Sequence, residues 1–196
     1  MNAPLPSSQI TLGILAGGRA TRLGGIDKAW IERDGIPQVL RWRRRFAAEA
    51  SAVLVSANRG LQRYRDAGLE VVADRVAGDV GPIAGLEALL GQCRTPWLLT
   101  LPVDLIGVND CLVATLWAER ARAGAFARDD DGDQPLVALW NVEAALPAAI
   151  AGIQHNETAI HALQARLRMP AVHFRGVRFG NLNTPADLQA AGIRHD

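Results

Sequence analysis

The amino-acid sequence predicts an α/β protein in which helices cover both faces of a mostly parallel sheet. Three observations lead to this prediction. Apolar segments typical of buried strands alternate with helical segments about four times in the first 125 residues. The connections are short, and no low-complexity linker divides the 196 residues. Hydrophobic residues form 49% of the chain and charged residues 21%, which allows one domain with a full core.

The regular half of the chain, about 10–125, should contain four strands. The apolar segment 10–16 is typical of a buried strand, and a glycine-rich polar loop, 17–28, follows it. Pro37 should begin a helix that extends to about residue 50. The other strands are expected at 52–57, 69–73 and 97–101, and the other helices at 61–67, 82–93 and 110–123, the last capped by Asn109.

The second half, about 125–192, has a less regular pattern. Two strands, 125–128 and 135–140, should flank the acidic loop 129–133. We interpret this loop as a turn, because Trp140 stands where a calcium-binding loop needs a bidentate Glu. Helices are expected at 142–151, with a break at Pro147, and at 157–167; a strand at 171–174 and a helix at 186–191 follow. We expect both halves to form a single domain, 1–196.

Composition excludes several classes of protein. Lys and Arg total 21 against 20 acidic residues, and this balance argues against binding nucleic acid through bulk charge. The two cysteines form no CxxC pair and the four histidines no HxxxH pair, so a disulfide scaffold, a structural zinc site and a His-based metal site lack support. No apolar run reaches the roughly 18 residues that span a bilayer. The N-terminus lacks signal-peptide features, so we expect a cytoplasmic protein without a membrane partner.

The glycine-rich loop 17–28 is the main candidate for a binding site. In parallel sheets ligands bind beyond the carboxyl ends of the strands, and adjacent glycines let backbone N–H groups approach a phosphate closely. The loop has neither GxGxxG nor GK[ST] spacing, so the two commonest nucleotide-binding motifs are excluded. Arg22 and Lys28 add positive charge, and Lys28 is the only lysine of the chain. A coding bias toward Arg explains the scarcity of lysine; the survival of this one indicates either chance or a need for a compact ammonium.

This loop carries a specific resemblance. Residues 15–28, LAGGRATRLGGIDK, resemble the LAGGxxxRxGGxDK signature of the molybdenum cofactor guanylyltransferases, the MobA family. Four further elements of that family occur in the same order: SANR at 56–59, Asp74 with GPIAG at 81–85, LPVD at 101–104 and NLNTP at 181–185. The resemblance extends from about residue 10 to 191. It implies a Rossmann-like three-layer αβα nucleotidyltransferase fold.

The resemblance also implies a reaction. GTP and a molybdopterin-type substrate, the molybdenum cofactor or its metal-free form, would give a guanine dinucleotide and pyrophosphate. The first half would bind the nucleotide and the second half the pterin. The family acts in the cytoplasm with Mg²⁺ and passes its product to apo-enzymes through molybdoenzyme maturation proteins. We expect a monomer.

Nucleotidyl transfer requires that charge on the α-phosphate and the leaving pyrophosphate be stabilised. Arg22, Lys28 and Asp104 are the candidate catalytic residues, with Asp104 as the Mg²⁺ ligand because Mg²⁺ is typically held by one or two carboxylates. Asn181 and Asn183 are the candidate substrate-binding residues. By resemblance, the nucleotide would contact Leu15, Ala16, Gly17, Gly18, Lys28, Asn58, Asp74 and Asp104.

The sequence departs from the family pattern at four places, and two other functions remain open. Leu105-Ile106 follows Asp104 where the family often has PCDxP, Val103 replaces Cys, Ala186 replaces Glu, and residues 155–158 occupy the place of a basic pair. The alternatives are a CTP-dependent or sugar-nucleotide transferase and a non-catalytic nucleotide-binding protein. The closing NLNTP element and the Gly17-Gly18 pair favour guanine.

Overall fold

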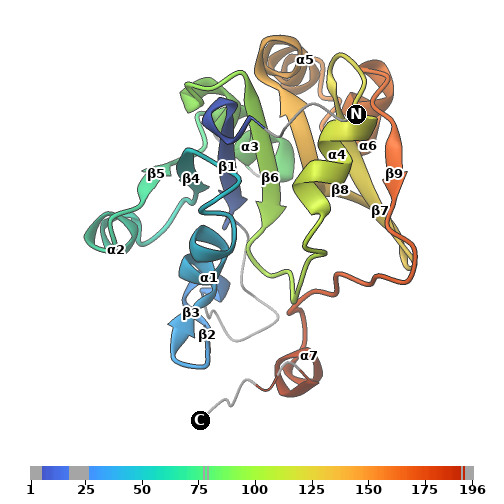
Figure 1. Cartoon of the computed structure of the whole chain (residues 1–196). Helices are drawn as coiled ribbons and strands as arrows, with labels where there is room; N and C mark the ends of the chain where they lie inside the picture. The colour runs from blue at the N-terminus through green and yellow to red at the C-terminus, as the bar shows by residue number, and fades with distance from the viewer. Residues whose placement is uncertain (1–5, 18–26, 77, 79, 191, 193–196) are drawn as a thin grey trace.

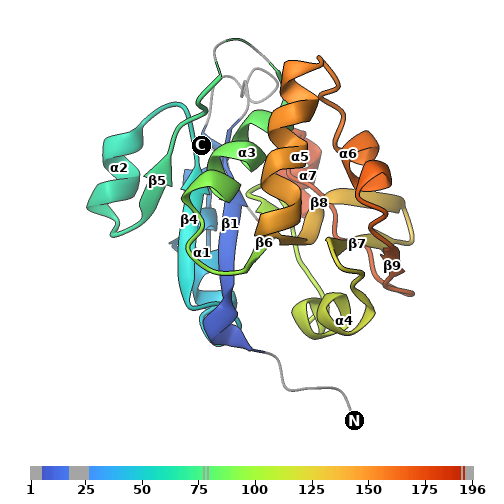
Figure 2. The ribbon, with the colours of Figure 1, turned by 90° about the horizontal axis from the view of Figure 1, so that it is seen from above.

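The computed structural model describes residues 6–17, 27–76, 78, 80–190 and 192. A seven-stranded sheet forms the middle layer, and helices cover both of its faces (Figures 1 and 2). The strand order is β5-β4-β1-β6-β8-β7-β9. The strands are β1 (Ile10–Leu15), β4 (Ala52–Ser56), β5 (Glu70–Val72), β6 (Trp97–Pro102), β7 (Gly124–Asp129), β8 (Gly132–Asn141) and β9 (Ala171–His173). The predicted three-layer α/β fold is confirmed.

The sheet is mostly parallel, as predicted. Parallel pairing joins β5, β4, β1 and β6, and β9 is parallel to β7, whereas β8 runs antiparallel to both β6 and β7. Leu15 at the end of β1 is aligned with Ser56 of β4 and Pro102 of β6. The carboxyl ends of three parallel strands therefore meet at one edge, which is where ligands bind in such sheets.

Strand β1 shows how the apolar sequence forms the core. All six of its residues are buried. Ile10, Leu12 and Ile14 pack with residues of α1 and α4, whereas Leu15 packs with residues of α3. Because successive side chains of a strand point to opposite faces, one continuously apolar strand supports both hydrophobic cores.

Helices α1 (Gln38–Arg45) and α4 (Leu112–Glu119) cover one face of the sheet, and α3 (Pro82–Gln92), α5 (Val142–Gln154) and α6 (Ile160–Arg166) cover the other. Helix α2 (Leu61–Asp66) packs beside β5 at the sheet edge. Helices α3 and α5 lie side by side (Figure 2). A Cβ on Gly152 of α5 would lie 3.4 Å from Ile83 Cδ1 of α3 and 3.0 Å from the Glu157 carbonyl oxygen after α5, so glycine permits this close packing. Of the helices in the described residues, none is long and apolar enough to cross a membrane.

Some details of the predicted elements are wrong. The helix expected from Pro37 to about residue 50 spans only Gln38–Arg45. Helix α5 contains Pro147 without a break, since burial of Ala145, Ala149 and Gly152 against α3 outweighs the backbone hydrogen bond that proline removes. The expected helix 110–123 is shorter: the Asn109 side chain accepts from the Cys111 N–H at 2.7 Å, but the helix spans only Leu112–Glu119.

The structure also adds a two-stranded ribbon that the sequence analysis did not predict. Strands β2 (Glu32–Arg33) and β3 (Ile36–Pro37) pair antiparallel around Asp34 and Gly35, whose φ angles are 54° and 69°. Helix α1 begins after this ribbon, at Gln38 rather than at Pro37. Figure 1 shows the ribbon and α7 (Pro185–Ala190) beyond the end of β6 that carries its arrowhead.

The segment before α7 runs along the loop that follows β6. The Leu182 N–H donates to the Asp104 carbonyl at 2.8 Å, and Leu105 forms an antiparallel bridge with Asn181. Gly180 accepts from the Ile106 N–H at 3.3 Å. The end of the described chain is thus placed against the site edge of the sheet.

Asp129 connects this C-terminal segment to the β7–β8 turn. Asp129 is only 2% exposed. Its carboxylate accepts hydrogen bonds from the N–H groups of Asp131, Gly132 and Phe179 and from the side-chain amide of Gln134. Burial opposes ionisation, but these hydrogen bonds, that from Phe179 foremost, together lower the pKa of the Asp129 carboxyl. The acidic loop is a turn, as predicted, and Asp129 is a structural clamp within it.

We expect Asp129→Asn to destabilise the fold by roughly 2 kcal/mol at pH 7, because it weakens several hydrogen bonds to a buried charge. The folded-state pKa lies below the ordinary value, so the stabilising contribution is present above about pH 4 and declines as the pH falls through the folded-state pKa. Urea unfolding should therefore show that the free energy of unfolding falls more between pH 7 and pH 3 for the parent than for the variant. Asp131→Asn is the control, because the Asp131 side chain is exposed and pairs with Arg178, and its backbone N–H is unchanged by the substitution. Equal stability of the parent and Asp129→Asn would contradict the structural role of Asp129.

Candidate active site

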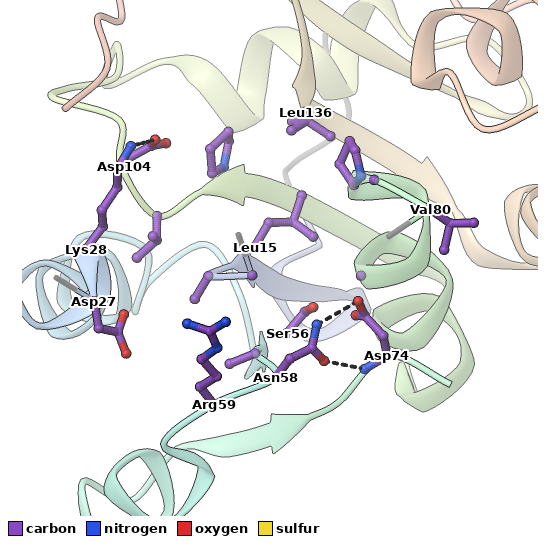
Figure 3. A pocket seen from close by; sticks show the side chains of 18 of the residues that line it. Leu15, Asp27, Lys28, Ser56, Asn58, Arg59, Asp74, Val80, Asp104 and Leu136 are labelled. Atoms are coloured by element: carbon purple, nitrogen blue, oxygen red, sulfur yellow. Dashed lines mark hydrogen bonds and ion pairs between the residues drawn. The ribbon is translucent and has the colours of Figure 1, made fainter. Parts of the chain in front are cut away.

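A cavity of about 620 Å³ lies beyond the carboxyl ends of β1, β4 and β6. Figure 3 shows side chains from the β1, β4, β5 and β6 ends around it. The cavity is closed on one side by the start of α3, where Gly81, with φ of 77°, precedes Pro82. Among the predicted residues, the following line it: Leu15, Ala16, Gly17, Lys28, Asn58, Asp74 and Asp104.

Two glycines shape the cavity in different ways: Gly17 leaves space open, and Gly85 permits close packing of its walls. Among the described residues, no atom lies within 4 Å of where a Cβ on Gly17 would be, so the missing side chain leaves room for a ligand against the backbone. A Cβ on Gly85 would lie 2.6 Å from Ser56 Oγ and 3.1 Å from Leu15 Cδ2. Gly85 therefore lets α3 pack directly on the ends of β1 and β4.

Asn58 and Asp74 form a paired unit on the β4–β5 side (Figure 3). Asn58 Nδ2 donates to Asp74 Oδ2 at 2.8 Å, and the Asp74 N–H donates to Asn58 Oδ1 at 2.9 Å. The other carboxylate oxygen, Asp74 Oδ1, is buried and has no hydrogen-bond partner among the described residues. Asn58 thus orients Asp74, and Asp74 retains an acceptor that no described residue uses.

Lys28 and Asp104 form an ion pair on the opposite side of the cavity. Lys28 Nζ donates to Asp104 Oδ2 at 2.8 Å and also to Asn183 Oδ1 at 2.8 Å. The side chains of Lys28 and Asp104 are 21% and 20% exposed, so both remain accessible from the cavity. The structure therefore joins the end of the glycine-rich loop, the end of β6 and the closing NLNTP segment at one ammonium.

Asp27 fixes the backbone at Lys28 by capping the short helix that begins there. Lys28 is the first residue of the short helix η3 (Lys28–Trp30), and Asp27 Oδ1 accepts from the Ala29 N–H at 3.1 Å. Tyr64 is fully buried, and its hydroxyl donates to Asp27 Oδ2 at 3.4 Å. Burial and the charge of Asp27 raise the pKa of Tyr64 far above its ordinary value, so this hydroxyl remains a donor.

Three side chains hold the loop around Asp104. Gln38 donates to the Leu105 carbonyl at 2.6 Å, Trp42 to the Val103 carbonyl at 3.1 Å and Arg33 to the Ile106 carbonyl at 2.7 Å. Leu105 is fully buried, and Ile106 packs against Ile31, Leu182 and Leu188. Leu105-Ile106, which departs from the PCDxP pattern, thus anchors the loop in the core.

A second cavity of about 230 Å³ adjoins the first at Asp104. It shares Pro102, Asp104 and Leu136 with the first cavity. Its other lining residues are Gln134, Pro135, Val137, Asn181 and Asn183. Among the described residues, the two predicted substrate-binding residues thus line the smaller cavity, and Asp104 is the one predicted nucleotide-binding residue that lines both cavities.

The start of α7 fixes the backbone of Asn183. Asp187 Oδ2 accepts from the N–H groups of Asn183 and Thr184 at 3.0 and 2.7 Å, and Thr184 Oγ1 accepts from the Asp187 N–H at 3.1 Å. Such reciprocal capping defines where a helix begins. The hydrogen bond from the Thr184 hydroxyl is the main cause of a lowered pKa at Asp187. Asp187 performs this role although Ala186 replaces the Glu of the family pattern.

Not every predicted residue can be placed. Gly18 and Arg22 lie outside the described residues. Residues 155–158 line neither cavity. Three residues that were not predicted as site residues also line the larger cavity: Arg59, which directly follows Asn58, and Asp27 and Tyr64. The adjacency of Arg59 to Asn58 was a usable signal; nothing in the sequence pairs Tyr64 with Asp27.

A cavity lined by Gly17, a lysine–carboxylate pair and the ends of parallel strands is typical of proteins that bind a nucleotide. Residues 12–169 match the family described as the MobA-like NTP transferase domain. This match covers most of the chain, so the chain belongs to the MobA-like NTP transferase family and is a nucleotidyltransferase by membership.

Relatives agree with this assignment. Proteins named molybdenum cofactor guanylyltransferase are 36% identical to this chain in Yersinia pseudotuberculosis, over 91% of this chain and 92% of the relative, and in Ralstonia nicotianae, over 97% and 99%. The crystal structure of molybdopterin-guanine dinucleotide biosynthesis protein A from Archaeoglobus fulgidus superposes with a TM-score of 0.69 at 20% identity, covering 92% of this chain and 96% of that chain. The structural likeness supports the fold.

Proposed function

We propose that this protein transfers GMP from GTP to the terminal phosphate of molybdenum-bearing molybdopterin, giving a guanine dinucleotide and pyrophosphate. The observation that carries the proposal is the Lys28–Asp104 pair at the wall shared by two adjoining cavities. Two cavities that meet at a charged pair suit a reaction between two phosphorylated substrates. The relatives named above provide the substrate class.

The larger cavity would hold GTP. The unpartnered Oδ1 of Asp74 is a suitable acceptor for the N1–H and 2-amino groups of guanine, which cytosine lacks in this arrangement. Leu15 and Ala16 would contact the nucleoside, and the open backbone at Gly17, together with Gly18, would approach the phosphates. Lys28 and Arg22 would supply the positive charge that the triphosphate requires.

The smaller cavity would hold the pterin phosphate, with Asn181 and Asn183 as hydrogen-bond partners. An oxygen of that phosphate would attack the α-phosphorus of GTP. A new P–O bond would form to the pterin, and the bond between the α-phosphorus and the oxygen of the leaving pyrophosphate would break. The ammonium of Lys28 would stabilise the negative charge that develops on these oxygens.

The donors at this position suit Mg²⁺, which we propose as the cofactor. No group of three or more His, Cys, Asp or Glu side chains in the described residues is arranged to hold a metal ion. Mg²⁺ in nucleotide-dependent enzymes is typically held by one or two carboxylates and by substrate phosphates, and Asp104 provides such a carboxylate between the two cavities. When bound, the cation would neutralise charge on the phosphates.

The cellular setting belongs to the same proposal. A monomer in the cytoplasm would make the dinucleotide and pass it to molybdoenzyme maturation proteins. Neither an interaction with nucleic acid nor one with a membrane is part of this function.

Incubation of the protein with Mg²⁺, molybdenum-bearing molybdopterin and each nucleoside triphosphate in turn tests the proposal. We expect pyrophosphate release and dinucleotide formation with GTP, at least about 100-fold faster than with CTP, because a site that hydrogen-bonds one base rejects another strongly. A chelator should stop the reaction. Turnover with CTP alone would refute the guanylyl assignment. GTP binding without turnover, whether or not the molybdopterin carries molybdenum, would indicate the non-catalytic alternative.

A further inference from the structure

Helix α3 contains a buried carboxylate that the proposed reaction does not use. Eight of its 11 residues are buried, and Glu87 is only 4% exposed among apolar neighbours. Removing a charge from water costs several kcal/mol unless a partner of opposite charge compensates. A charged residue in a helix that is buried along most of its length therefore needs a specific explanation.

The compensating partner is Arg75, which lies on the loop after β5. Arg75 Nε donates to Glu87 Oε2 at 3.2 Å, and Arg75 Nη2 donates to Glu87 Oε1, so the pair is bidentate. The hydrogen bond to Glu87 raises the pKa of Arg75. Gly91 provides the space for the guanidinium, because a Cβ there would lie 2.7 Å from Arg75 Nη2. Three residues of the chain are thus adapted to this one contact.

The contact connects two walls of the larger cavity. Arg75 directly follows Asp74, whose carboxylate and N–H are both bonded to Asn58. Helix α3 contributes Pro82 and Gly85 to the same cavity. The Arg75–Glu87 pair therefore fixes Asp74 relative to α3, at the point where the chain leaves β5 and begins the loop that leads to Gly81.

We propose that Arg75 and Glu87 are positioning residues for base selection: their ion pair holds Asp74 where its free oxygen accepts hydrogen bonds from guanine. This inference rests on the proposed function. It assigns to the pair the preference for a base that carries both an N1–H and a 2-amino group. If the Asp74 carboxylate moved out of hydrogen-bond distance of the base, this discrimination would be lost, since hydrogen bonds to a base edge require short and aligned contacts.

Comparison of GTP with ITP, which lacks the 2-amino group, measures this role directly. Calorimetric titration of the parent protein should give GTP an affinity at least about 10-fold above that of ITP. In the double variant Arg75→Leu/Glu87→Leu, we expect the affinity for GTP to fall about 5-fold more than that for ITP, because ITP loses only the contact through its N1–H, so that the preference falls to about 2-fold. Thermal unfolding should be nearly unchanged, because the double variant removes the buried Glu87 charge together with its half-exposed partner Arg75 and leaves no unpaired charge in the core.

Two further variants make the test decisive. Arg75→Lys keeps the positive charge but cannot form the bidentate contact, and we expect a partial loss of preference even if the double variant folds poorly. Arg94→Leu is the matched control, because Arg94 and Glu70 form an exposed pair at 3.8 Å that contributes nothing to the cavity. A double variant and an Arg75→Lys variant that keep the parent preference would overturn the inference, as would equal weakening of GTP and ITP. Failure of the parent to bind GTP would instead refute the proposed function, and the inference with it.

Discussion

Asp104→Asn is expected to reduce the rate of dinucleotide formation at least about 1000-fold, equivalent to about 4 kcal/mol of transition-state stabilisation. Asparagine retains an oxygen that can accept from Lys28 Nζ, so the geometry of the ion pair is largely preserved. The variant removes the negative charge at the wall shared by the two cavities, and with it the proposed Mg²⁺ ligand. Single-turnover kinetics with GTP, Mg²⁺ and molybdopterin measure the effect, and Mg²⁺ should no longer increase the affinity for GTP.

The control for this prediction is Asp110→Asn. Asp110 lies on the same connection after β6, but its side chain is 96% exposed and pairs with Arg45 away from both cavities. We expect parental kinetics from this variant. Parental kinetics from Asp104→Asn itself would remove Asp104 from the active site.

Lys28→Arg is expected to lower kcat about 100-fold, about 3 kcal/mol, although the charge is retained. The Lys28 ammonium contacts Asp104 and Asn183 at 2.8 Å each, in a side chain only 21% exposed. Arginine presents a longer, planar fork that cannot occupy the position of a compact ammonium. Steady-state kinetics should show the loss mainly in kcat, since the interaction is proposed to strengthen in the transition state.

Thermal unfolding of Lys28→Arg should differ little from that of the parent, because the ion pair is partly solvated. Arg44→Lys, a conservative exchange at an exposed position of α1, should leave both kinetics and stability unchanged. If Lys28→Arg were as active as the parent, the single lysine of the chain would be a remnant of coding bias.

The elements predicted best are those in which most residues are buried. Strand β1 and helix α3 are buried along nearly their whole length, so local hydrophobicity alone marks them. Pro147 misled the prediction because its cost is local, whereas the packing of α5 on α3 that outweighs it comes from distant residues. The β2–β3 ribbon was predictable: Asp34-Gly35 is a typical hairpin turn pair.

In the candidate site, too, some features could be predicted from the sequence and others depend on contacts between distant residues. Strand ends and the glycine-rich loop indicated the nucleotide cavity, because carboxyl ends of parallel strands meet at one edge. The contacts of Lys28 with Asp104 and Asn183 span 76 and 155 residues and could not be derived from spacing. The roles of Asp129 and Asp187 depend on which backbone N–H groups lie nearby, which only the folded chain determines.

The separation of Lys28 from Asn183 also has a consequence for protein synthesis. The ammonium can acquire its asparagine partner only after residue 183 has left the ribosome, when β1, β4, β5 and β6 have long been available to pair. Contacts of such long range form slowly, because the ends of a long intervening segment must be brought together first. A nascent or prematurely terminated chain would therefore contain most of the larger cavity but not Asn181 and Asn183, which line the smaller one. Group transfer would then be confined to chains that have been synthesised past residue 183.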